Sequence, residues 1–127
     1  MTVCAIGDLG PGCLDLKGIR ANDRNLMYIN LSVTGTPVVL TGTEVFEAQA
    51  RLKAKDTGAP AISAEVSIAN AATGRLAIRW PGTDVATMLG TADKWKGVWD
   101  LQQTDAVPEP VTLLAGKFEA GWDVTRP

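Results

Sequence analysis

Apolar and polar residues alternate along several stretches of the chain, and this period of two is typical of β-strands that bury one face. In residues 44–53 the apolar set is Phe46, Ala48, Ala50 and Leu52, and polar or charged residues lie between them. The same alternation occurs in residues 26–33, 62–69, 74–80, 94–103 and 112–125. Clusters rich in turn-forming residues separate these stretches, as in residues 34–42, 55–60 and 70–74. The pattern predicts a meander of antiparallel strands.

Residues 83–90 are the one departure from this alternation. Thr83 or Asp84 can cap a short helix and Gly90 can end it, with Val85 closing over one end of the core. The predicted fold is therefore all-β. It is a single antiparallel β-sandwich of the Ig-like type, with about seven strands and one short helical turn near residues 83–90.

Two similar segments, GVWDLQ at 97–102 and GWDVTR at 121–126, place a tryptophan on the apolar phase of a strand. Trp99 and Trp122 are therefore predicted to be structural, and Trp80 shares the apolar phase of residues 74–80. Gly97 and Gly121 would leave room beside the indoles. An alternative is a sugar-stacking platform, which would need Trp95, Trp99 or Trp122 on the outer face.

The first 14 residues show neither strand nor helix periodicity, although several of them are apolar. We interpret residues 1–14 as an irregular N-terminal arm and residues 15–127 as the domain. An apolar segment without its own structure must pack on another surface, and we expect a neighbouring subunit to provide it. The candidate partner-binding residues are Val3, Ile6, Leu9 and Leu14.

The charge and the apolar runs argue against several classes of partner. The net charge is −2, and the 12 Lys and Arg residues are dispersed, so the chain lacks the basic patch of a nucleic-acid-binding protein. The longest apolar runs are far shorter than the roughly 20 residues that span a bilayer. The N-terminus lacks the basic segment followed by an apolar segment that is typical of a secretory signal, so we expect synthesis in a cytoplasm.

Cys4 and Cys13 are the only cysteines, and the chain contains no histidine. A zinc site is therefore not expected, and no cofactor or other metal is predicted. Because cytoplasmic thiols usually stay reduced, we expect two small buried or half-buried thiols, with a disulfide between them as the other option.

Few combinations of residues in this chain could act in catalysis, because catalytic triads that need a histidine are excluded. A pair of carboxylates could hydrolyse a glycosidic bond, with Asp100 and Asp123 as the pair to test, alone or with Glu47 or Glu65. These side chains fall on polar strand phases, so we interpret them as solvated surface charges. The arginines Arg51, Arg75 and Arg79 would pair with such carboxylates across strands. The chain is not expected to be an enzyme.

The order of motifs along the chain is similar to a known family. It runs from ND at 22–23 and GTPVVLTG at 35–42, through GRLAIRW and GVWDLQ, to the closing TLLAGKFEAGWDVTR. Over residues 15–126 this order resembles the small β-sandwich at the N-terminus of phage upper-baseplate proteins and in related short tail proteins. The resemblance implies a structural virion protein, made in the host cytoplasm and built into the tail or baseplate.

The family domain is an assembly module, so the resemblance carries over no catalytic residue. It implies docking onto other phage tail or baseplate proteins or fibres, and onto copies of itself, without nucleic acid or membrane. The alternative function is a carbohydrate-binding module that uses exposed tryptophans to recognise the host surface.

Overall fold

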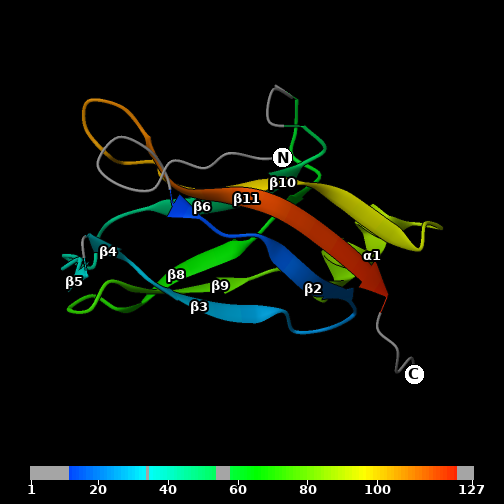
Figure 1. The fold of residues 1–127 in the computed structure, drawn as a ribbon, viewed down its shortest axis with the longest axis horizontal. Coiled ribbons are helices and arrows are strands. Elements are labelled where there is room, and N and C mark those ends of the chain that lie inside the picture. Colours follow the sequence, from blue (N-terminus) through cyan, green and yellow to red (C-terminus); the bar gives the residue numbers. More distant parts are fainter. Residues whose placement is uncertain (1–11, 34, 54–57, 123–127) are drawn as a thin grey trace.

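The computed structural model describes residues 12–33, 35–53 and 58–122, and Figure 1 shows their arrangement. The elements in chain order are β1 (Gly12–Cys13), β2 (Leu16–Ala21), β3 (Leu26–Asn30), β4 (Ser32–Val33), β5 (Thr36–Pro37), β6 (Phe46–Arg51), β7 (Ile62–Ser63), β8 (Glu65–Asn70), β9 (Arg75–Arg79), α1 (Gly82–Leu89), β10 (Lys94–Gln103) and β11 (Val111–Trp122). Each stretch of alternating residues contains at least one strand, so the all-β prediction is confirmed.

The strands form two main sheets. Sheet A has the order β1-β11-β10-β6-β7, with β2 also paired to β11, and it curls into a half-barrel. Sheet B has the order β3-β9-β8, and β4 and β5 form a small separate pair. In Figure 1, sheet B lies below sheet A, and α1 lies at the right-hand end beyond β2. Buried residues from both sheets belong to one hydrophobic cluster.

The expectation of purely antiparallel pairing is wrong at the N-terminal strands. β1 and β2 both run parallel to β11, whereas β10 pairs antiparallel with β11 and with β6. A tight turn sets the direction of neighbouring strands in a hairpin. Most of the chain separates β2 from β11, so no turn dictates their relative direction.

The chain passes from sheet A to sheet B within one short stretch between β7 and β8. β7 pairs with β6 in sheet A, and β8 pairs with β9 in sheet B. Ala64, which lies between them, still donates its N–H to the carbonyl oxygen of Ala48 in β6 at 2.9 Å. The predicted strand over residues 62–69 is therefore a corner that serves both sheets.

Asn25 connects the two sheets at another crossing. Its Nδ2 donates to the carbonyl oxygens of Arg20 at 2.7 Å and Trp80 at 3.1 Å, and its Oδ1 accepts from the N–H of Arg20 at 2.9 Å. The N–H of Trp80 donates back to the carbonyl oxygen of Asn25 at 3.2 Å. Arg20 lies in β2 of sheet A, and Trp80 directly follows β9 of sheet B, so one amide side chain links the two sheets.

The helix α1 confirms the predicted helical turn. It buries Val85 and Leu89 and ends at Gly90, whose φ of 57° lies in the left-handed region that favours glycine. In Figure 1 it closes the end of the molecule beside β2.

The predicted N-cap at Thr83 or Asp84 is wrong. The helix begins at Gly82, and the capping position is Pro81, which provides no side-chain hydrogen bond. A Cβ on Gly82 would collide with the backbone of Asp23, so only glycine allows the first turn to approach so closely.

The aromatic rings pack edge to face at the centre of the core. The indole of Trp80 is fully buried, with its ring centroid 6.1 Å from that of Trp99 and 4.8 Å from that of Phe118. Trp99 is 2% exposed, and its Nε1 donates to the carbonyl oxygen of Leu14 at 2.7 Å. The prediction that these two tryptophans are buried is confirmed.

Trp122 lies at the edge of the core. It is half-buried, and its Nε1 donates to the carbonyl oxygen of Ala92 at 2.9 Å. Gly97 leaves room for an indole as expected, but the ring beside it belongs to Trp95. Gly121 faces Arg20 instead, so that part of the prediction is wrong.

Replacing Trp99 by Ala should lower the free energy of unfolding by about 3–5 kcal/mol, because a large side chain leaves a cavity in the core. Trp122→Ala should cost clearly less, since its ring is half-buried. Chemical denaturation of both variants measures the difference. A loss below about 1 kcal/mol for Trp99→Ala would contradict the packing described above.

Asn25→Gly should lower the free energy of unfolding by about 1–3 kcal/mol, because glycine keeps the positive φ but loses the side-chain hydrogen bonds. The matched control is Asn22→Gly, at the neighbouring residue with positive φ, 59° against 48° for Asn25. We expect this control to be neutral or slightly stabilising. Equal losses in the two variants would mean that the Asn25 amide does not hold the sheets together.

Candidate functional site

Four exposed valines lie on segments at one end of the molecule. Val39 and Val45 belong to the loop after β5, Val107 belongs to the loop between β10 and β11, and Val111 begins β11; these segments lie at the left-hand end in Figure 1. We call this surface the valine end; its residues are Val39, Val45, Val107 and Val111. Val107 is 93% exposed and Val39 is 75% exposed. Exposed apolar residues that gather on one surface are typical of sites that bind other proteins.

Hydrogen bonds hold the two loops of the valine end together. The N–H of Thr104 donates to the carbonyl oxygen of Val45 at 2.9 Å, and the N–H of Val45 donates to Oδ1 of Asp105 at 3.1 Å. The backbone N–H and carbonyl oxygen of Val45 are therefore both hydrogen-bonded within the chain. This leaves the valine side chains available to a partner.

Glu44 organises the first of these loops. Its carboxylate accepts hydrogen bonds from the N–H of Thr41 at 2.9 and 3.1 Å, and from the N–H of Gly42 at 3.0 Å. These bonds, that from the Thr41 backbone most of all, hold the pKa of Glu44 below its usual value. The segment that carries Val39 and Val45 is thus shaped around a carboxylate that stays ionised.

The predicted N-terminal arm is only partly visible. Val3, Ile6 and Leu9 lie outside the described residues. Leu14 is 37% exposed, and its N–H donates to the carbonyl oxygen of Ala115 at 3.1 Å. The last residues of the arm therefore join the domain's own sheet through β1 and Leu14. Binding of the rest of the arm to a neighbouring subunit stays a prediction.

Cys13 departs from the expectation of a reduced, buried thiol. It lies exposed in β1 and is disulfide-bonded. The chain's only other cysteine, Cys4, lies outside the described residues. The expectation rested on the redox state of a cytoplasm, which carries no information about how close two side chains come.

Asp100 lies on the outward face of β10, opposite Gln49 and Ala115. It is half-buried, and burial raises the pKa of its carboxyl above the usual value, while the nearby Arg51 opposes this shift. The placement on a polar strand phase is confirmed. The partial burial was not expected, because alternation distinguishes the two faces of a sheet but not what covers them.

Of the predicted carboxylates that the structure describes, Asp100 and Glu47 lie on neighbouring strands of sheet A and Glu65 lies on sheet B, while the pair of Asp100 and Asp123 stays a prediction. Asp123 lies outside the described residues, and Glu65 projects from sheet B, on a different sheet from Asp100. Glu65 pairs instead with Arg79 at 2.6 Å, as the sequence predicted for a cross-strand pair. Glu47 is exposed on β6, opposite Gln102.

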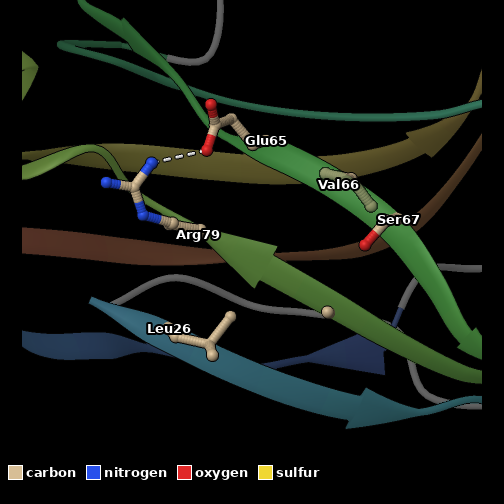
Figure 2. A pocket seen from close by; sticks show the side chains of 6 residues that line it. Leu26, Glu65, Val66, Ser67 and Arg79 are labelled. Atoms are coloured by element: carbon tan, nitrogen blue, oxygen red, sulfur yellow. Dashed lines mark hydrogen bonds and ion pairs between the residues drawn. The ribbon is translucent and has the colours of Figure 1, made fainter. Parts of the chain in front are cut away.

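A shallow hollow lies on the outer face of sheet B (Figure 2). It encloses about 200 Å³ and is lined by Leu26, Glu65, Val66, Ser67, Ala77 and Arg79. The Glu65–Arg79 ion pair forms one edge, where the dashed line in Figure 2 marks it. Small-molecule sites usually enclose about 300–1,000 Å³, so this hollow is closer to the size of a side chain.

Sequence reasoning missed the valine end and the hollow. Val39 lies in residues 34–42, which were interpreted only as a turn, Val45 falls off the apolar phase of residues 44–53, and Val107 lies in residues 104–110, to which no element was assigned. The available signal was apolar residues inside turn segments, where no strand phase would bury them. The hollow had no sequence signal, since it depends on three strands meeting around Ala77.

Among the described residues, His, Cys, Asp and Glu side chains form no group of three or more that could hold a metal ion. In the part of the chain that the structure describes, no helix has the length and apolar character to cross a bilayer. No protein family and no curated protein matches the chain.

Replacing Asp100 by Asn should stabilise the protein at pH 7. A folded-state pKa raised above the unfolded value of 3.8 means that the ionised carboxylate disfavours the fold. This cost is present above the folded-state pKa and disappears as the pH falls below the unfolded value. Denaturation at pH 7 and near pH 3 should therefore show a gain for Asp100→Asn only at pH 7. A loss of stability at pH 7 would mean that the carboxylate makes a favourable interaction instead.

Proposed function

We propose that this protein is a structural module of a phage tail or baseplate that docks other tail proteins or fibres. The observation that carries the proposal is the valine end, where exposed apolar side chains lie on two segments that hydrogen bonds hold together. A surface of this kind loses water favourably when a partner covers it. The motif order over residues 15–126 supports the choice of a phage assembly protein.

We also propose that the two sheets correspond to the two layers of the Ig-like β-sandwich that the resemblance implies. Burial of residues from both sheets in one cluster supports this assignment. The parallel pairing of β1 and β2 with β11 would then be a variation on that architecture.

The proposal assigns no catalytic role, cofactor or metal to the chain. It places the protein in the virion after synthesis in the host cytoplasm, without contact to nucleic acid or membrane. Asp100 and the ion-paired Glu65 then act as ordinary surface groups on separate sheets.

The alternative, a carbohydrate-binding module, has less support. The indole of Trp99 is buried and bonded to a backbone carbonyl, so it offers no face for a sugar ring. Trp95 packs edge to face on Phe118, with ring centroids 5.7 Å apart. Trp95 and Trp122 are each half-buried.

Replacing Val39 and Val45 together by Asp should prevent incorporation into phage particles, because two charges would have to be buried against the partner. The measurement is the amount of this protein in purified particles when the variant replaces the native chain. The matched control is Leu52→Asp, which changes an exposed leucine outside the valine end.

Both variants should melt like the native protein, since the changed side chains are exposed. Normal incorporation of the Val39 and Val45 variant would mean that the valine end is not the docking surface. Complete particles that never contain the native protein would contradict the proposed function as a whole.

A further inference from the structure

Two surfaces of the described chain are complementary in shape and charge. One is the hollow on the outer face of sheet B, and the other is the loop formed by residues 104–110 between β10 and β11. We propose that this loop of one copy docks into the hollow of a second copy, with Val107 entering the hollow. The inference deepens the proposed assembly function by naming a partner, and its biological use rests on that function.

The hollow has an apolar floor that suits a small apolar side chain. Leu26 and Ala77 line it from β3 and β9, and Val66 of β8 borders it while its side chain packs against the core. The short side chain of Ala77 leaves the space, because longer residues stand on either side of it along β9. Its volume of about 200 Å³ provides room for one side chain and some of the chain next to it.

The rim of the hollow offers positive charge. Arg79 pairs with Glu65 at 2.6 Å, so this arginine is largely compensated. Arg75 lies two residues from Ala77 on the same strand face, with its guanidinium 4.4 Å from the centre of the Tyr28 ring. No carboxylate of the described residues forms an ion pair with Arg75. The Tyr28 ring holds the guanidinium of Arg75 in position, and a guanidinium held in this way can bind a carboxylate of a partner.

The loop carries the matching features. Val107 is the most exposed large apolar residue of the described chain, at 93%. Asp105 and Glu109 stand two residues before and two residues after it, and residues 104–110 contain no basic residue. Oδ1 of Asp105 already accepts a hydrogen bond from the N–H of Val45, whereas Glu109 has no hydrogen-bond or ion-pair partner among the described residues. Glu109 is therefore the carboxylate best placed to reach Arg75.

The spacing of charges agrees on the two surfaces. Arg75 and Arg79 are four residues apart on a strand, which at about 3.3 Å per residue separates their Cα atoms by roughly 13 Å. Asp105 and Glu109 are also four residues apart, and a chain of that length reaches at most about 14 Å. Ala77 and Val107 are the midpoints of the two sets. With Val107 above Ala77, Glu109 would therefore lie on the Arg75 side of the hollow.

The contact must join different copies, since a chain cannot place this loop in its own hollow. In Figure 1 the loop between β10 and β11 projects at the upper left, whereas sheet B forms the lower side of the molecule. A contact between two different surfaces is head-to-tail, and repetition of it produces a ring or a filament. The contact is small, so it should be weak in isolation and strengthened by high local concentration in an assembly.

Sedimentation equilibrium of the purified full chain, over a range of concentrations, tests the inference. The native chain should self-associate, and Val107→Glu or Ser67→Glu should each weaken association by at least about tenfold, because a charge then faces the apolar floor or the acidic loop. The matched controls are Leu52→Glu, an exposed apolar residue elsewhere, and Ser63→Glu, an exposed strand serine of sheet A. Both controls should associate like the native chain.

Mixing the two deficient variants distinguishes this contact from other modes of association. Val107→Glu keeps an intact hollow and Ser67→Glu keeps an intact loop, so an equimolar mixture should form a complex of two copies and no larger species. Glu109→Arg should also weaken association, and adding Arg75→Glu to the same chain should restore it. Higher salt should weaken the native contact, because exposed charges take part in it.

A native chain that remains monomeric at about 1 mM would overturn the inference, because such a contact would be too weak to use. Failure of the mixed variants to form a complex would also overturn it. The particle assay separates this result from the proposed function. Monomeric behaviour with normal incorporation of Ser67→Glu, which changes the hollow and not the valine end, would refute the copy-to-copy contact and leave the docking role of the chain intact.

Discussion

The hydrogen bonds of the Asn25 side chain are the constraint on which the two-sheet arrangement depends. They lie where the chain leaves sheet A after β2, and they reach the residue where it leaves sheet B after β9. Each sheet has an apolar face that must be covered, and the amide fixes the distance at which the two faces meet. Trp80 stands at this junction, with its backbone held by Asn25 and its ring at the centre of the core.

The buried position of Trp80 lowers the stability of the fold in one respect, and the packing around its ring must compensate for this. Its Nε1 is buried and has no hydrogen-bond partner in the described part of the chain, which is unfavourable by about 1–3 kcal/mol. The ring makes edge-to-face contacts with Trp99 and Phe118, and aromatic pairs of this kind contribute about 0.5–1.5 kcal/mol each beyond the area they bury. A large apolar surface thus compensates one unpaired N–H.

The same architecture separates the surfaces that we propose to bind partners. Sheet B turns its outer face, with the hollow and Arg75, away from the core, while the loops of the valine end leave the strands at one end. The exposed valines and Arg75 lie outside the hydrophobic cluster, so these side chains can change without loss of the fold. This independence suits an assembly module, because substitutions can change its contacts with partners while its hydrophobic core stays the same.

The alternation of residues determined much of the fold without any structure. It placed the strands other than β1, β2 and β5, assigned Ala48 and Leu101 to the buried face and Glu47 and Asp100 to the outward face, and marked α1 by its interruption. These are local properties, because the pleat puts successive side chains on opposite faces whatever the neighbouring strand is.

Tertiary structure alone decided that β1 and β2 run parallel to β11, that residues 62–70 serve two sheets, and that Asn25 joins them. It also decided the hollow around Ala77 and the exposure of Val107. Each of these depends on segments far apart in the chain, and the periodicity of one segment carries no information about which other segment packs against it.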